Sequence, residues 1–118
     1  MHELSIVESV VTSVAEWLED QPSTARVKTV TLRIGALSGV VEDALQFGYE
    51  IATEGTPLAG SLLCVHRQPV VIFCQICAEP VELPGVHSFQ CPRCGTPSGD
   101  IRKGRELEIE SLEVEDNE

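Results

Sequence analysis

At 118 residues, with 42% apolar but only 4% aromatic side chains, the chain can form one small core made mainly of valine, isoleucine and leucine. The formal net charge of -11 opposes binding to nucleic-acid backbones and to anionic membrane surfaces, so we expect neither partner. No apolar run reaches the roughly 18 residues that a membrane span requires. The chain start lacks the basic stretch of a secretory signal, and with reduced thiols we predict a cytoplasmic protein.

The first half of the chain predicts a helix, a strand and a second helix. Apolar residues recur every three or four positions from Leu4 to Leu18, which is typical of an amphipathic helix. In residues 27–34 the period changes to two, which predicts a half-buried strand closed by Gly35. After a loop, Glu42 opens a second helix, which stops at Gly55.

The second half predicts strands around a cysteine-rich insertion. Residues 61–67 alternate as a strand, and residues 70–73 continue extended after a break at Pro69. Residues 100–105 are a polar, basic hinge, and a final strand begins at Leu107. We therefore predict an α+β fold in which two helices pack on one face of a three-stranded mixed sheet, with an inserted zinc ribbon built on four cysteines.

The cysteine-rich insertion has the spacing of a metal site. Two Cys-x-x-Cys pairs, Cys74 with Cys77 and Cys91 with Cys94, are separated by thirteen residues. A tight turn brings each pair together and a hairpin joins the pairs around one ion, for which zinc is preferred because it suits a closed shell of four soft sulfurs. The alternatives are iron in the same cage, four reduced thiols without a metal, or two disulfides, which close poorly within such pairs.

The first three residues of the chain also offer nitrogen donors that could bind a metal ion. We expect Met1 to be retained before the large His2, so that the Met1 amine, the His2 amide and the His2 imidazole stand in sequence. Three nitrogens in one plane, with the Glu3 amide or carboxylate as a fourth donor, form the square-planar set that Ni(II) and Cu(II) favour. Nearby acidic residues, Glu42 or Asp43, would offset the positive end of a helix dipole. On chemistry alone, the alternative is that His2 is an ordinary exposed side chain.

Three segments in this order resemble the HypA/HybF family of hydrogenase maturation factors that deliver nickel. They are the start Met1-His2-Glu3-Leu4-Ser5, the segment Arg33-Ile34-Gly35-Ala36-Leu37-Ser38, and the paired Cys-x-x-Cys ribbon before a glutamate-rich strand. The resemblance covers the whole chain. It implies a nickel-binding domain in residues 1–69 and 104–118, a zinc domain in residues 70–103, and no enzymatic activity.

By position, the resemblance implies that His2 is the essential nickel ligand, beside backbone nitrogens of Met1, His2 and Glu3. The pattern of one family member also places an aspartate before the second helix; this chain has Val41 there, followed by Glu42 and Asp43, of which Glu42 is the preferred candidate. Zinc is implied at Cys74, Cys77, Cys91 and Cys94. The implied partners are an accessory GTPase of the HypB type, the hydrogenase large subunit and, in some members, urease accessory proteins; the protein itself is expected to be a monomer or homodimer.

The remaining cysteine and histidines, and the basic residues of the ribbon, give weaker signals. Cys64 and His66 share one side of a strand and form either a metal pair or, as we predict, a buried free cysteine beside a satisfied histidine. His87 is predicted to be exposed in the ribbon loop, and Arg93 belongs to a solvated basic rim. The alternative functions are a zinc-ribbon module that binds protein or nucleic acid, and a small electron carrier with iron in the thiolate cage.

Overall fold

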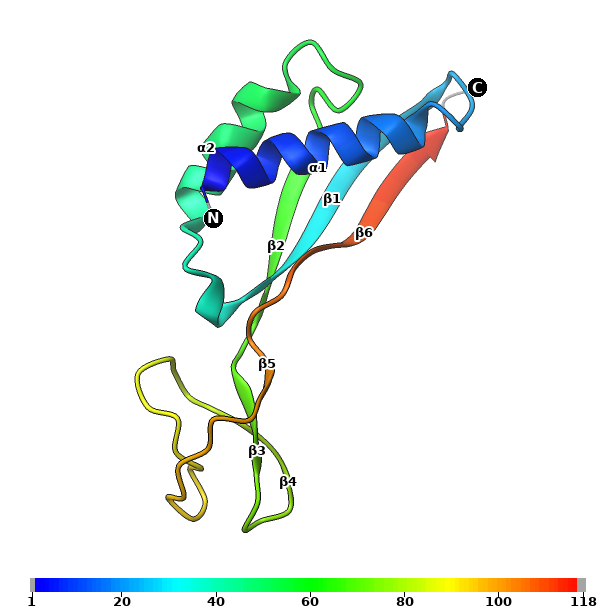
Figure 1. Cartoon of the computed structure of the whole chain (residues 1–118). Helices are drawn as coiled ribbons and strands as arrows, with labels where there is room; N and C mark the ends of the chain where they lie inside the picture. Colours follow the sequence, from blue (N-terminus) through cyan, green and yellow to red (C-terminus); the bar gives the residue numbers. More distant parts are fainter. Residues whose placement is uncertain (1, 117–118) are drawn as a thin grey trace. The chain divides into compact units, whose positions relative to one another are not determined.

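The computed structural model describes residues 2–116, which form helices, strands and the loops between them (Figure 1). In chain order the elements are α1 (Glu3–Leu18), β1 (Ala25–Gly35), the 3-10 helix η1 (Ala36–Ser38), α2 (Glu42–Thr53), β2 (Leu62–Gln68), β3 (Val71–Cys74), β4 (Glu79–Glu82), β5 (Ile101–Lys103) and β6 (Leu107–Asp116). Among these residues no helix has the length and apolar character to cross a membrane.

The chain divides into two compact units. Within the described part, residues 2–32, 40–65 and 109–116 form the first unit, and residues 33–39 and 66–108 form the second. The first unit therefore contains both α-helices, and the second contains all four cysteines of the ribbon. That one unit serves nickel and the other zinc stays a prediction.

The two helices of the first unit pack against each other through small and β-branched residues. An added Cβ at Gly48 of α2 would lie 3.7 Å from Val7 Cγ2 and 3.9 Å from Leu4 Cδ1, so the glycine allows α1 to approach closely. The predicted apolar stripe of α1 is confirmed over its central turns, where the buried residues are Ile6, Val7, Val10, Val11 and Val14. Its ends differ, because Leu4 is 50% exposed and Trp17 is 41% exposed.

The first sheet has the strand order β2-β1-β6, as expected for a last strand that returns to the sheet. β1 and β2 run in the same direction and β6 runs in the opposite one, so the sheet is mixed (Figure 1). Alternate residues of β1, namely Val30, Leu32 and Ile34, are buried, which confirms the period of two read from the sequence. The α+β prediction is thus confirmed.

The second sheet, in the order β4-β3-β5, builds the ribbon. Ile72 of β3 pairs antiparallel with Val81 of β4 and with Ile101 of β5. The predicted hinge over residues 100–105 is therefore wrong, because its middle is a short strand. Ile101 packs against the buried Val70 and Ile72. This apolar contact stabilises the strand although the residues around Ile101 are polar.

Candidate metal centre

The fold of the second unit brings the four predicted cysteines together. The Sγ atoms of Cys74, Cys77, Cys91 and Cys94 all lie within 4.8 Å of one another. Cys74 Sγ is 3.5 Å from Cys94 Sγ, and Cys77 Sγ is 3.9 Å from Cys91 Sγ. No other group of three or more His, Cys, Asp or Glu side chains within residues 2–116 converges in this way.

The backbone after each pair turns in the same way. Ala78, directly after Cys77, has a φ of 57°, and Gly95, directly after Cys94, has a φ of 77°. These left-handed residues close the two turns, and Gly95 N–H donates to the Cys91 carbonyl at 2.7 Å. The Cys77 N–H lies 3.4 Å from Cys74 Sγ, so the turn also directs an amide at a sulfur.

The distances between the sulfurs fit a tetrahedral ion. With Zn–S bonds of about 2.3 Å, sulfurs at the corners of a tetrahedron lie about 3.8 Å apart. Two of the separations, 3.5 and 3.9 Å, fall on either side of that value, and all of them stay within 4.8 Å. Two of the ligands are deep, with Cys74 0% and Cys91 2% exposed, whereas Cys94 is exposed at the surface. The donor set and geometry therefore suit a closed structural site.

The ionisation of the cysteines supports the same conclusion. Hydrogen bonding with the side chain and backbone of Thr96, whose Oγ1 is 3.1 Å from Cys94 Sγ, lowers the pKa of Cys94 to about 6. The side chain of Cys74 and the other nearby thiols raise the pKa of Cys77 to about 12. The Cys94 thiolate therefore forms readily while Cys77 resists ionisation, and four thiolates together require a cation between them. Thr96 was not predicted from the sequence; its position two residues after the last cysteine was the available signal.

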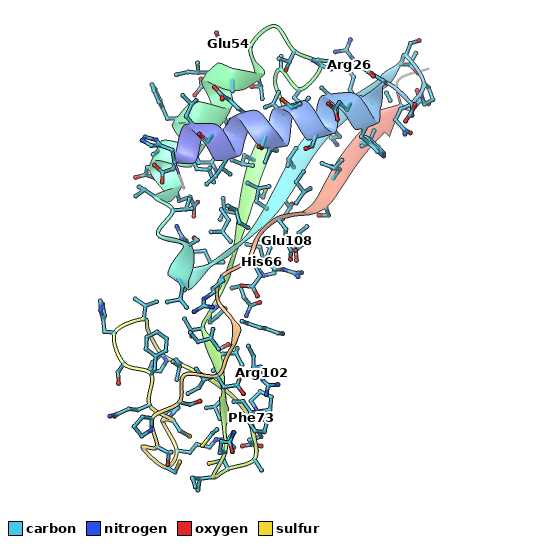
Figure 2. All side chains as sticks on the ribbon, in the orientation of Figure 1. Arg26, Glu54, His66, Phe73, Arg102 and Glu108 are labelled. Atoms are coloured by element: carbon cyan, nitrogen blue, oxygen red, sulfur yellow. The ribbon has the colours of Figure 1, made fainter. Side chains whose placement is uncertain are left out.

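Charged residues around the ribbon are paired with one another, which refines the predicted basic rim. Arg93, between the second pair of cysteines, forms an ion pair with Glu79 just beyond the first pair. The guanidinium of Arg102 lies 4.7 Å from the ring centre of Phe73 and bonds Asp100 at 2.8 Å (Figure 2). These contacts connect β5 to β3 and the second cysteine pair to β4.

The predicted nickel ligands belong to the first unit, where two helix starts meet. His2 is exposed and is the N-cap of α1, and Glu3 begins the helix. Glu3 Oε2 accepts a hydrogen bond from the Val41 N–H at 3.4 Å, and Glu42, partly buried, follows as the first residue of α2. Met1, the remaining predicted ligand, lies outside the described residues.

The other predicted residues are distributed as follows. Cys64 is exposed, so the prediction of a buried cysteine is wrong; it points to the opposite face of β2 from the buried Leu63. His66 is also exposed. His87 is exposed, as predicted.

Comparisons with known proteins agree with this arrangement. A family model described as "Hydrogenase/urease nickel incorporation, metallochaperone, hypA" matches residues 1–114. The chain is 50% identical over 114 residues to hydrogenase maturation factor HypA of Chloroflexus aurantiacus (strain ATCC 29366 / DSM 635 / J-10-fl), covering 97% of this chain and 99% of that protein. It is 49% identical over 114 residues to the same factor of Chloroflexus aggregans, with the same coverage.

Solved structures share the fold. The solution structure of the Ni metallochaperone HypA from Helicobacter pylori superposes with a TM-score of 0.66 at 21% identity, covering 99% of this chain and 100% of that one. Because the family model spans residues 1–114 and relatives are up to 50% identical along nearly their full length, the chain belongs to the HypA family of nickel-incorporation metallochaperones.

Proposed function

We propose that this protein binds Ni(II) at its N-terminus and delivers it during maturation of a [NiFe]-hydrogenase, with zinc held structurally by the four cysteines. The ion is a cargo and not a catalytic centre, so no enzymatic activity is assigned. The nickel ligands are the His2 imidazole and backbone nitrogens of Met1, His2 and Glu3, with Glu42 as a further carboxylate. Nitrogen-rich planar sites of this kind favour Ni(II).

The observation that carries the nickel proposal is the position of His2 as N-cap of α1. Ile6 N–H donates to the His2 carbonyl at 3.2 Å, so the amide of Glu3 belongs to the first turn. Amides of a first turn lack intrahelical acceptors, and coordination of nickel there breaks no bond of the helix. The imidazole and these amides are therefore available together.

The electrostatics of the meeting helices also support a site there. The positive dipole ends of α1 and α2 approach each other where Glu3 accepts from Val41, and a bare cation would be repelled. Carboxylates occupy the same place, because α1 begins with Glu3 and α2 begins with Glu42 and Asp43. Their negative charge offsets the dipoles and reduces the repulsion of a divalent ion.

The proposed partners follow from the family. Two relatives at 49% and 50% identity are named hydrogenase maturation factors. These names support the hydrogenase large subunit as the recipient of nickel, and we propose an accessory GTPase of the HypB type as a partner in the delivery. The matching family description also mentions urease, so urease accessory proteins are a second proposed client group. We place this exchange in the cytoplasm, with the protein acting as a monomer or homodimer.

Replacing His2 with alanine is expected to weaken nickel binding by at least about 100-fold, because it removes the only side-chain nitrogen of the proposed site. Calorimetric titration of the zinc-loaded protein with Ni(II) measures this directly. His87→Ala, which removes another exposed histidine, is the matched control and should bind as the parent does. If His2→Ala still takes up one nickel with unchanged affinity, the site assignment is wrong.

Nickel affinity is also expected to fall between about pH 7.5 and about pH 5, because protons compete with the metal for imidazole, amine and amide nitrogens. Titrations at several pH values, with zinc content checked at each, separate this effect from loss of the ribbon. Equal affinity at both ends of the range would contradict a nitrogen-rich site.

A further inference from the structure

A groove runs along α2 in the first unit, separate from the four cysteines. One wall is α2 and the other is the segment of residues 59–63 that leads into β2. Its volume is about 510 Å³. That space is large enough for side chains of a partner protein.

The walls of the groove carry large apolar side chains in contact with solvent. Phe47 on α2 is 67% exposed, and Leu62 at the start of β2 is 65% exposed. Ile51, one turn after Phe47 on the same helix but not part of the groove lining, is 51% exposed. Neighbouring exposed apolar side chains of this size are typical of an interaction surface, whereas isolated ones are common on any protein.

The floor of the groove is polar but already satisfied. Tyr49 Oη lies 2.6 Å from Ser61 Oγ, and the Gln46 amide donates to the Leu63 carbonyl at 2.8 Å. Because these groups bond each other, they offer little to a small polar ligand. They also hold α2 against the edge strand β2, so the groove is preformed.

The rim of the groove carries acidic residues that do not stabilise the helix. Residues 42–63 contain four carboxylates and no lysine, arginine or histidine. Two of the four, Glu50 and Glu54, line the groove at the C-terminal end of α2, whose last turn has no basic residue; Figure 2 marks Glu54 there. Negative charge at that end faces the negative pole of the helix dipole and is locally unfavourable. Acidic residues that destabilise the helix on which they lie are more readily explained by a function than by stability.

We propose that this groove, lined by Phe47, Leu62, Glu50 and Glu54, docks a basic amphipathic helix of a partner protein. Apolar side chains of that helix contact Phe47 and Leu62, and its lysines or arginines pair with Glu50 and Glu54. Addition of a strand fits less well, because Gln46 already occupies the Leu63 carbonyl of the edge strand. A second copy fits less well too, because it brings the same acidic groove and a net charge of -11. The surface does not depend on nickel.

The test uses the full chain and a synthetic amphipathic peptide of about five helical turns, built from leucine, alanine and lysine. A second peptide keeps the apolar positions and replaces every lysine with glutamate. Nuclear magnetic resonance titration of the isotope-labelled, zinc-loaded protein locates binding and measures the dissociation constant of each peptide. We expect shifts concentrated on α2 and residues 59–63 with the lysine peptide, and at least about 10-fold weaker binding of the glutamate peptide.

Variants separate the apolar contribution from the charged one. Phe47→Ala should weaken binding of the lysine peptide by about 10-fold, whereas Ile76→Ala, which removes a 71% exposed apolar residue of the second unit, should leave it unchanged. The double variant Glu50→Gln with Glu54→Gln should bind several-fold more weakly and depend less on salt. The melting temperature of this double variant should not fall, because the two charges do not stabilise the free protein.

Three results would overturn the proposal. Shifts outside the groove, equal binding of both peptides, or an unchanged affinity of Phe47→Ala would each show that the groove is not the docking surface. Sedimentation equilibrium without peptide provides the remaining arm: a dimer that Phe47→Ala dissociates would identify a second copy as the occupant instead. His2→Ala serves as an independent check, since it should leave peptide binding intact while nickel binding is lost.

Discussion

Replacing Cys74 with serine is expected to release the metal from the second unit and to unfold the ribbon. Cys74 ends β3, is 0% exposed and packs with Val81 and Cys91, so a serine there loses a ligand inside a small core. Structural zinc sites supply on the order of 10 kcal/mol of apparent binding free energy at neutral pH, which exceeds what a core of this size provides alone. Metal analysis and amide hydrogen exchange of residues 66–108 measure the two losses.

The chain offers a matched control for this experiment. Cys64→Ser changes the same atom at an exposed cysteine outside the cluster, so zinc content and exchange rates should match the parent protein. Chelation of the parent should reproduce the effect of Cys74→Ser without any mutation. Retention of one zinc per chain and of slow exchange in Cys74→Ser would show that the four-thiolate site does not hold the ribbon together.

Replacing Gly35 with alanine is expected to lower the free energy of unfolding by more than about 3 kcal/mol, because the added methyl group has no space. A Cβ built at Gly35 would lie 2.1 Å from the carbonyl carbon and oxygen of Gly104 and 2.5 Å from the Arg105 nitrogen. All three are backbone atoms, which cannot rotate away. The same backbones are joined where Gly35 N–H donates to Glu106 O and Leu37 N–H donates to Gly104 O, each at 2.8 Å.

Urea denaturation of Gly35→Ala and of the control Gly99→Ala tests this account. A Cβ at Gly99 meets no atom within 4 Å and its φ lies outside the left-handed region, so that substitution should be neutral or slightly stabilising. A loss of less than about 1 kcal/mol in Gly35→Ala would mean that the two backbone segments separate easily there. The result also bears on the segment Arg33–Ser38, since the close backbone approach gives a physical reason for glycine at its centre.

Local patterns account for most of what the sequence predicted correctly. Apolar spacing located α1, β1 and α2 because helix and strand periods depend on the next few residues alone. The spacing of the cysteines located the metal centre for a similar reason, since each turn is closed by residues adjacent in the chain. The proposed nickel chemistry of His2 also rests on three consecutive residues, and it stays a prediction.

The wrong predictions concern features that depend on contacts between residues far apart in the chain. The strand β5 was missed because its only apolar residue, Ile101, gains its partners from β3, almost thirty positions earlier. Cys64 was predicted to be buried because the pattern of its strand does not reveal which face of β2 other elements cover. Exposure depends on which elements become neighbours, and a period of two cannot specify that.

The amino-acid sequence by itself determined α1, β1 and α2, the four-sulfur donor set and the family, because each depends on short-range spacing and on residue type. Only the tertiary structure decided that Phe47 and Leu62 share one acidic groove, that Gly35 touches Gly104, and that the starts of both helices meet at Glu3. These contacts join residues 15 to 69 positions apart, and they exist only after the chain has packed its apolar faces together.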